Sequence, residues 1–147
     1  MQFTCIYNLR KKIMHSAANT FSREISRHFD SYFEEYDLAT SYVELLLILY
    51  NCGELSQNDL AESMNLAPST ITRFINKLVK KNLVQKKKSG RTAVISLSKK
   101  GLALSPTLKE SFDKAVKDLE GILSDKYVHT TKELLVHGTT LLKEKEG

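Results

Sequence analysis

Between residues 69 and 80, hydroxyl, amide and basic side chains alternate with apolar ones at three- and four-residue spacings. This spacing places the two kinds of side chain on opposite faces of one helix. Hydroxyl, amide and guanidinium groups can hydrogen-bond base edges in a DNA major groove, which is wide enough to admit a helix. The apolar face comprises Ile71, Phe74, Ile75, Leu78 and Val79. The polar face comprises Ser69, Thr70, Thr72, Arg73, Asn76, Lys77 and Lys80.

A basic hairpin is expected directly after this helix. Leu83–Lys88 and Thr92–Leu97 have strand-like composition, and the Ser89-Gly90 pair between them predicts a turn. Lysine side chains suit phosphates, which supply affinity and register without sequence information. An arginine near the tip can enter an adjacent minor groove, where the potential is negative. The basic residues of this hairpin are Lys86, Lys87, Lys88 and Arg91.

The positive charge of the chain is concentrated in this central region. The whole chain has 22 Lys and Arg against 17 Asp and Glu, a formal net charge of +5. Residues 63–109 contain no acid, and the remainder of the chain has a net charge of −6. A basic block of this size indicates a polyanionic partner, either nucleic acid or, less often, an anionic membrane, although a solvated lysine-rich face is the plain alternative. The block's eleven basic residues are Arg73, Lys77, Lys80, Lys81, Lys86, Lys87, Lys88, Arg91, Lys99, Lys100 and Lys109.

The elements that position these side chains are predicted to be mostly helices. Apolar periodicity predicts helices over residues 6–36, 43–50, 57–64, 69–80, 107–123 and 131–145. In the central region, Gly53 is expected to end a helix that is buried on several sides. Ser56 is a good N-cap with Asp59 three residues later, Pro68 suits a first helical turn, and Asn82 suits a left-handed residue after a helix.

Two further helix starts are predicted in the C-terminal third. Pro106 is placed near the beginning of the helix over 107–123. A capping box over Thr130–Glu133 is expected to open the last helix. The apolar residues expected to face inward from that last helix are Leu134, Leu135, Leu141 and Leu142.

Composition excludes several classes of protein. A chain of 147 residues with 41% hydrophobic and 27% charged residues suits one globular domain. The longest apolar run, Leu45–Tyr50, is too short to span a membrane, and the first residues do not resemble a signal peptide. Two cysteines favour a reduced, cytoplasmic protein. Because no catalytic triad, phosphate-binding loop or paired catalytic carboxylates are recognisable, we expect neither an enzyme nor a cofactor.

The central region resembles that of MarR-type transcriptional regulators. The resemblance is carried by residues 55–62, 67–73 and 78–84, and residues 91–101 resemble the wing and its exit. It implies a mainly α fold with a small β-hairpin wing, in which a winged helix-turn-helix is flanked by N- and C-terminal dimerisation helices. It also implies a homodimer that binds a pseudo-palindromic double-stranded DNA operator, usually to repress, and that responds in many members to a small-molecule effector.

The resemblance divides the chain into regions and assigns DNA contacts. Residues 1–37 correspond to an N-terminal dimerisation region, 38–101 to the winged helix-turn-helix and 102–147 to C-terminal dimerisation helices, within one compact domain. Arg91 matches the base-facing arginine of the wing, but Ser89-Gly90 replaces the family's usual Asp and first Arg, so we expect the lysines to supply more of the binding. The expected DNA-binding residues are Ser56, Ser69, Thr70, Thr72, Arg73, Asn76, Lys77, Lys80, Lys86, Lys87, Lys88 and Arg91.

Other features leave alternatives open. The main alternative to DNA binding is a winged-helix adaptor for protein interaction, which would lack a steep, salt-dependent affinity for DNA. Cys5 invites a redox-sensing interpretation that the sequence does not decide, whereas Cys52 is expected to be buried. Glu24 and His28 share a helix face, yet ordinary histidines and no metal site are the default. An aromatic set favours core or dimer interface over an effector pocket: Phe21, Phe29, Tyr32, Phe33 and Tyr36.

Overall fold

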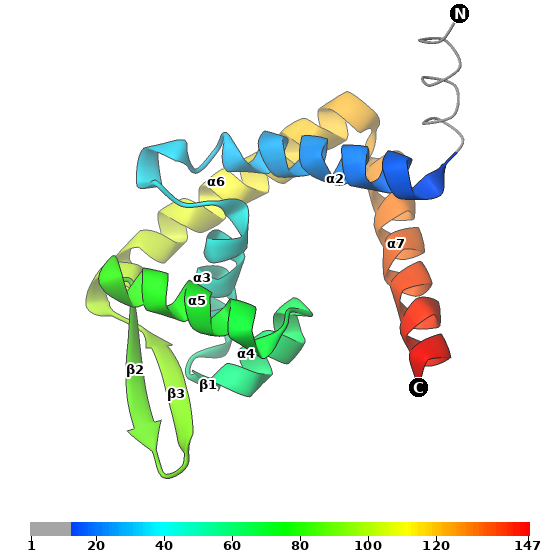
Figure 1. The fold of residues 1–147 in the computed structure, drawn as a ribbon. Helices are drawn as coiled ribbons and strands as arrows, with labels where there is room; N and C mark the ends of the chain where they lie inside the picture. The colour runs from blue at the N-terminus through cyan, green and yellow to red at the C-terminus, as the bar shows by residue number, and fades with distance from the viewer. Residues whose placement is uncertain (1–12) are drawn as a thin grey trace, which may run out of the picture. The chain divides into compact units, whose positions relative to one another are not determined.

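The computed structural model describes residues 13–147 and is mainly helical with one small antiparallel sheet (Figure 1). The predicted fold class is therefore confirmed. The chain forms two compact units, Met1–Ser111 and Phe112–Gly147, and each is considered by itself below. Residues 1–12, which include Cys5 and the expected start of the first helix, lie outside the described residues.

The first described helix, α2, spans Met14–Asp30 and is shorter than the helix predicted over residues 6–36. A turn follows Asp30, and a short 3₁₀ helix, η1, covers Glu34–Tyr36. The carboxylate of Asp30 accepts hydrogen bonds from the backbone N–H and the hydroxyl of Thr40, at 2.8 and 2.6 Å. Because Asp30 caps the next helix in this way, the chain turns here instead of continuing the helix.

The next helix, α3, spans Thr40–Cys52 and forms the centre of the first unit. Its buried side chains are Val43, Leu45, Leu46 and Leu49, as expected for a helix that is covered on several sides. Gly53 follows it with φ +79°, a conformation that glycine adopts without strain, which confirms the predicted helix end. Cys52 is exposed, so the prediction that it is buried is wrong; it lies in the last turn, beyond the buried face.

The two central helices form where local capping residues predict them. Helix α4 spans Gln57–Met64 and begins with a capping box between Ser56 and Asp59. Helix α5 spans Pro68–Lys80, with proline in its first turn. Asn82 has φ +57°, which confirms the predicted left-handed residue after α5. Val79 does not join the buried face as predicted, because its side chain is 38% exposed at the edge of the apolar stripe.

The sheet contains one strand more than the predicted hairpin. Strands β2 (Val84–Ser89) and β3 (Thr92–Leu97) form the hairpin, and β1 (Leu55–Ser56) pairs with the other edge of β3. Ser89 pairs with Thr92, so the turn consists of Gly90 and Arg91 and not of Ser89 and Gly90. Gly90 has φ +63°, which glycine satisfies at the first position of a two-residue hairpin turn.

Helix α6 spans Lys99–Leu123 and starts earlier than predicted. The Ser98 hydroxyl accepts a hydrogen bond from the Gly101 N–H at 3.0 Å and donates one to the carbonyl of Asn82, which anchors the helix start. Gly101 packs against the backbone of Leu83, where an added Cβ would lie 2.0 Å from the carbonyl oxygen. Pro106 is therefore inside the helix and does not mark its beginning.

The last helix, α7, spans Asp125–Glu146 and belongs to the second unit. Ser124 caps it by accepting a hydrogen bond from the Tyr127 N–H at 3.2 Å, so the predicted capping box at Thr130 is wrong. The leucines expected to face inward are exposed in the single chain: Leu134, Leu135, Leu141 and Leu142. Among residues 13–147, no helix combines the length and apolar composition that crossing a membrane requires.

Candidate nucleic-acid interface

The outward face of α5 is a stripe of four exposed side chains that face away from the core. Ile71, Ile75 and Leu78 are fully buried and fix the rotation of the helix. The opposite side is therefore held toward solvent by the 3.6-residue period. We call this the recognition stripe, and its residues are Ser69, Arg73, Asn76 and Lys80.

Thr72 lies at the edge of the recognition stripe that is nearer to α4. Its hydroxyl donates a hydrogen bond to the Pro68 carbonyl at 3.0 Å and accepts one from the side-chain amide of Gln57. Because a hydroxyl has a single hydrogen to donate, Thr72 can offer a partner outside the chain only its remaining acceptor capacity. Its hydroxyl therefore joins the two helices of the helix-turn-helix, at a position for which the sequence predicts direct contact with DNA.

Lys77 and Thr70 lie at the opposite edge of the stripe, which faces the beginning of α3. The Lys77 ammonium lies 4.7 Å from the centre of the Tyr42 ring, within the range of a cation–π contact. The Tyr42 ring is in turn 4.5 Å from the ring of Phe74. Tyr42 is absent from the DNA-binding residues predicted from the sequence. The one signal that could have indicated it is its position as a tyrosine in the first turn of a largely apolar helix.

Ser56 serves first as a helix cap. Its hydroxyl accepts a hydrogen bond from the Asp59 N–H at 3.1 Å and donates one to the Asp59 carboxylate at 2.7 Å. These bonds satisfy a backbone donor that the helix start would otherwise leave without a partner. The position of Ser56 in β1, paired with Val94 of the hairpin, connects the start of α4 to the wing.

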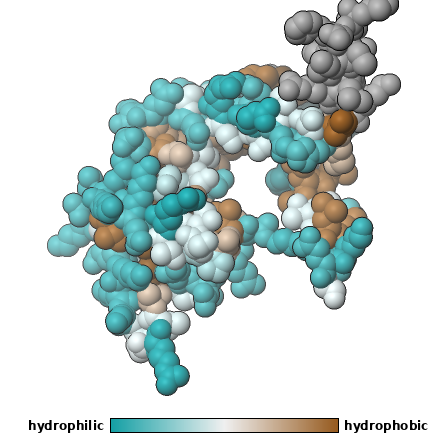
Figure 2. Space-filling model, viewed as in Figure 1, coloured by the Kyte–Doolittle hydropathy of each residue, from teal (hydrophilic) through white to brown (hydrophobic). Residues whose placement is uncertain are grey.

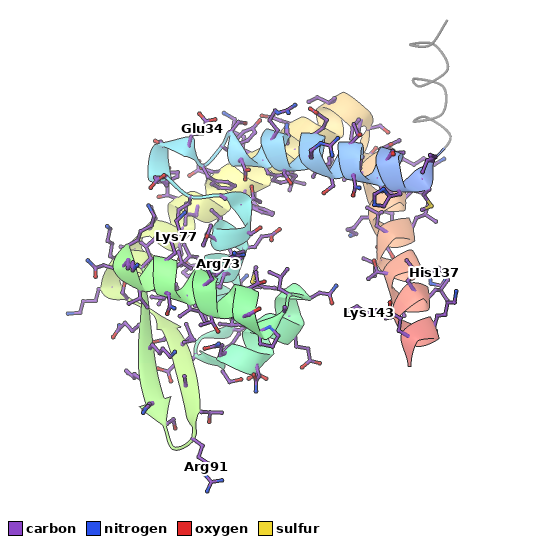
Figure 3. All side chains as sticks on the ribbon, viewed as in Figure 1. Glu34, Arg73, Lys77, Arg91, His137 and Lys143 are labelled. Atoms are coloured by element: carbon purple, nitrogen blue, oxygen red, sulfur yellow. The ribbon has the colours of Figure 1, made fainter. Side chains whose placement is uncertain are left out.

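The basic side chains of the wing lie on two different faces. Directly paired residues of an antiparallel sheet share a face, and Lys86 pairs with the buried Ile95. Lys86 and Lys88 therefore lie on the core-facing side of the hairpin, and Lys87 lies on the other side. Arg91 occupies the turn, and Figure 3 shows its side chain projecting beyond the strands. All four basic side chains are exposed.

An ion pair fixes the end of α5 to the segment before α3. The Lys81 ammonium lies 2.6 Å from the Asp37 carboxylate. The hydrogen bond and the charge of Lys81 lower the pKa of Asp37 below its ordinary value of 3.8, with a smaller contribution from the charge of Lys77. The carboxylate is therefore ionised at neutral pH and holds Lys81 at the end of the helix.

The residues considered for a metal site or an effector pocket lie in α2 and in the segment that follows it. Glu24 pairs with Arg27 at 2.6 Å. Among residues 13–147, no group of three or more His, Cys, Asp or Glu is arranged to hold a metal ion. Phe33 is completely buried and belongs to the core, whereas Phe21, Phe29, Tyr32 and Tyr36 are half-buried.

Comparisons with known proteins agree with this architecture. Residues 40–91 match the sequence model of the MarR family. The transcriptional regulator SarZ of Staphylococcus aureus strain USA300 is 33% identical over 92 residues, which are 60% of this chain and 62% of SarZ. SarZ of Staphylococcus haemolyticus is 26% identical over 102 residues, 67% of this chain and 69% of that protein. The matches thus span about two thirds of the length of these relatives.

The chain also shares its fold with the protein of a solved protein–DNA complex. The Staphylococcus aureus MepR–DNA complex superimposes with a TM-score of 0.75 at 22% identity, over 87% of this chain and 97% of MepR. At that identity the likeness shows the fold alone. The family match adds the class of protein, which comprises transcription regulators and not enzymes. Over residues 40–91 the chain therefore matches the MarR family of winged helix-turn-helix transcriptional regulators, and its fold is that of the solved MepR structure.

Proposed function

We propose that this chain is a cytoplasmic, homodimeric repressor that binds a pseudo-palindromic site in double-stranded DNA and is released by a small-molecule effector. The observation that carries the proposal is the coincidence of the acid-free block, residues 63–109, with α5 and the wing. Because this block has basic but no acidic side chains, both α5 and the wing attract the phosphates of a nucleic-acid partner. The likeness to SarZ, a transcriptional regulator, and to MepR, solved in complex with DNA, supports the same function.

The contacts divide by chemistry into base contacts and phosphate contacts. Arg73 and Asn76 lie at the centre of the recognition stripe and are the proposed contacts to base edges, with Ser69 and Thr70 beside them. Lysine contacts neutralise phosphates, and Arg91 of the turn enters the minor groove. Thr72 and Ser56 act mainly by holding α4 and α5 in place. The proposed phosphate contacts are Lys77, Lys80, Lys86, Lys87 and Lys88.

A second copy of the chain is the proposed partner of α7. Along this helix, five large apolar side chains are between 51% and 71% exposed: Leu134, Leu135, Val136, Leu141 and Leu142. Figure 2 shows brown, hydrophobic side chains along α7, whereas the wing is teal and white with some pale brown. Several large exposed apolar side chains on one helix are typical of an interface. The remaining regulatory proposals, repression and release by an effector, rest on the likeness of residues 40–91 to the MarR family.

Selection of bound fragments from random duplex DNA at two salt concentrations tests the proposal. We expect enrichment of an inverted repeat and an affinity that falls steeply and linearly with the logarithm of salt concentration. Light scattering at micromolar concentration should give the mass of a dimer. The adaptor alternative would instead give no salt-dependent DNA affinity, and charge reversal at Lys86, Lys87 and Lys88 would leave function intact.

A further inference from the structure

Tyr42 is an aromatic residue in the first turn of α3, and it contacts the edge of the proposed DNA-binding face. Its side chain is half-buried, as is that of Phe74, and their ring centres lie 4.5 Å apart with the planes 37° from each other. The Phe74 ring supports one side of the tyrosine. The Lys77 ammonium lies 4.7 Å from the centre of the Tyr42 ring. Three side chains from two helices are therefore in contact at this edge.

This group restricts a side chain that is normally mobile. A lysine loses rotamer entropy when its ammonium is fixed, and that loss weakens a phosphate contact. A ring face attracts the ammonium electrostatically but covers only one side of it. The N–H donors on the other side stay available to an oxygen anion. A lysine that is already held over a ring therefore has less freedom to lose when it binds a phosphate.

The Asp37 carboxylate does not remove Lys77 from this arrangement. Asp37 is close enough for its charge to interact with Lys77, yet its Oδ2 lies 2.6 Å from the Lys81 ammonium. Lys81 thus supplies the hydrogen-bonded counterion of Asp37. Lys77, one helical turn earlier on α5, is left on the aromatic ring at the edge of the recognition stripe.

We propose that Tyr42 is a positioning residue for DNA binding, because its ring holds the Lys77 ammonium where it meets a backbone phosphate. The proposal rests on the DNA-binding function proposed above and deepens it, since it adds a residue of α3 that acts through Lys77. The ring carries the effect and the phenolic hydroxyl is not required. Loss of the ring should therefore weaken binding to every sequence alike, because phosphates carry no base identity.

The test measures the binding of the full-length protein to a duplex of random sequence across a salt series. The variants are Tyr42→Phe, which keeps a ring, and Tyr42→Leu, which removes it, each made with Lys77 intact and with Lys77→Gln. Tyr50→Leu is the matched control, because Tyr50 is an exposed tyrosine at the other end of the same helix. Thermal unfolding of each variant reports the structural cost of the substitution separately.

We expect Tyr42→Leu to weaken binding about two- to fivefold at low salt, which corresponds to an exposed cation–π contact. Tyr42→Phe and Tyr50→Leu should bind like the wild type. In the Lys77→Gln background, Tyr42→Leu should cause no further loss. In nuclear magnetic resonance spectra of the free protein, the ε-methylene protons of Lys77 should show an upfield ring-current shift that Tyr42→Phe retains and Tyr42→Leu abolishes.

Equal losses from Tyr42→Leu in both Lys77 backgrounds would overturn the inference, since the tyrosine would then act through general stability or through another contact. A loss in Tyr42→Phe as large as that in Tyr42→Leu would also overturn it, because the hydroxyl would be the active group. Failure of the wild type to bind duplex DNA at any salt concentration would remove the proposed function, and the inference with it. The inference alone would fail if the wild type bound DNA but Tyr42→Leu had the same effect with Lys77 intact and with Lys77→Gln.

Discussion

The Lys87 ammonium lies 3.9 Å from the carboxylate of Glu54, on the face of the sheet opposite to the one that carries Lys86 and Lys88. Both side chains of the pair are more than half exposed, so water and salt screen it. The three consecutive lysines of the wing are therefore not equivalent. Lys86 and Lys88 share the core-facing side, whereas Lys87 has an acid beside it that a phosphate would have to displace or tolerate.

Replacing Glu54 by glutamine should strengthen DNA binding, because Lys87 then loses a competing carboxylate. We expect affinity for a random duplex to rise by up to about fivefold at low salt and to return toward the wild-type value at high salt. Fluorescence anisotropy measures the change. Glu24→Gln is the matched control, since Glu24 is also exposed and paired, with Arg27 of α2. Equal gains in both variants would point to net charge and not to Lys87.

Replacing Lys88 by glutamine should weaken binding to all sequences by the same factor. If Lys88 neutralises one phosphate of each half-site, the slope of log affinity against log salt should become shallower by about one for each phosphate that is no longer neutralised. Lys126→Gln provides a control, because Lys126 lies outside the basic block in α7. A salt slope identical to that of the wild type would place Lys88 away from the DNA.

Replacing Arg73 by alanine should relax sequence preference at one position of each half-site. Arg73 lies at the centre of the recognition stripe, and a good bidentate contact to a base contributes about 1–3 kcal/mol of discrimination. Competition with single-base variants of the selected site measures this change. Lys80→Ala, at the end of the same stripe, should instead weaken all sites alike. Unchanged preference in Arg73→Ala would contradict the assignment of α5 as the recognition helix.

Replacing Asp37 by asparagine should remove a pH-dependent part of stability. The pKa of Asp37 is lowered in the folded protein, chiefly by the hydrogen bond from Lys81. Its contribution to folding stability is therefore fully present at pH values above 3.8, the ordinary pKa of the group. That contribution is lost as the pH falls through the lowered pKa of the folded state. At neutral pH the wild type should melt at a slightly higher temperature than the variant, and the difference should vanish in strong acid. A difference that persists unchanged in acid would mean that Asp37 acts through packing.

Replacing Gly101 by alanine should destabilise the protein by about 1–3 kcal/mol, because a new Cβ would collide with the backbone of Leu83. Gly121 is the matched site in the same helix, with no atom within 4 Å of an added Cβ. Alanine there should stabilise the protein by about 0.5–1 kcal/mol, since alanine favours helix interiors. Denaturant unfolding measures both changes, and equal effects at the two sites would refute the close approach of Gly101 to Leu83.

Local capping explains which elements could be predicted from the sequence. Helices α4 and α5 begin and end at residues whose own side chains or backbone preferences fix the boundary, such as Ser56, Pro68 and Asn82. The end of α2 could not be predicted in the same way. It depends on a hydrogen bond from Thr40 to Asp30, a partner that only the tertiary structure brings near. The start of α6 likewise depends on Ser98 reaching the carbonyl of Asn82.

The same distinction applies to the candidate site. The outward direction of Arg73 and Asn76 follows from helical periodicity alone, so the sequence was sufficient to place them on one face. The contacts at the two edges of that face could not be predicted from periodicity. Thr72 is engaged by Gln57 and Lys77 by Tyr42, and both partners come from other helices. Periodicity describes which way a side chain faces, but it carries no information about which neighbours lie there.

The two-residue turn of the wing has a consequence for the DNA. Strands β2 and β3 have six residues each, and Gly90 and Arg91 connect them in a two-residue turn with no unpaired residue on either side. A paired strand rises about 3.3 Å per residue, so the hairpin sets how far the backbone of Arg91 extends from the core. In the proposed complex, a duplex that bends or narrows a groove toward the wing tip would meet Arg91 more closely. The cost of bending or narrowing it depends on base composition, which would let the protein discriminate among sequences at positions that none of its side chains touches.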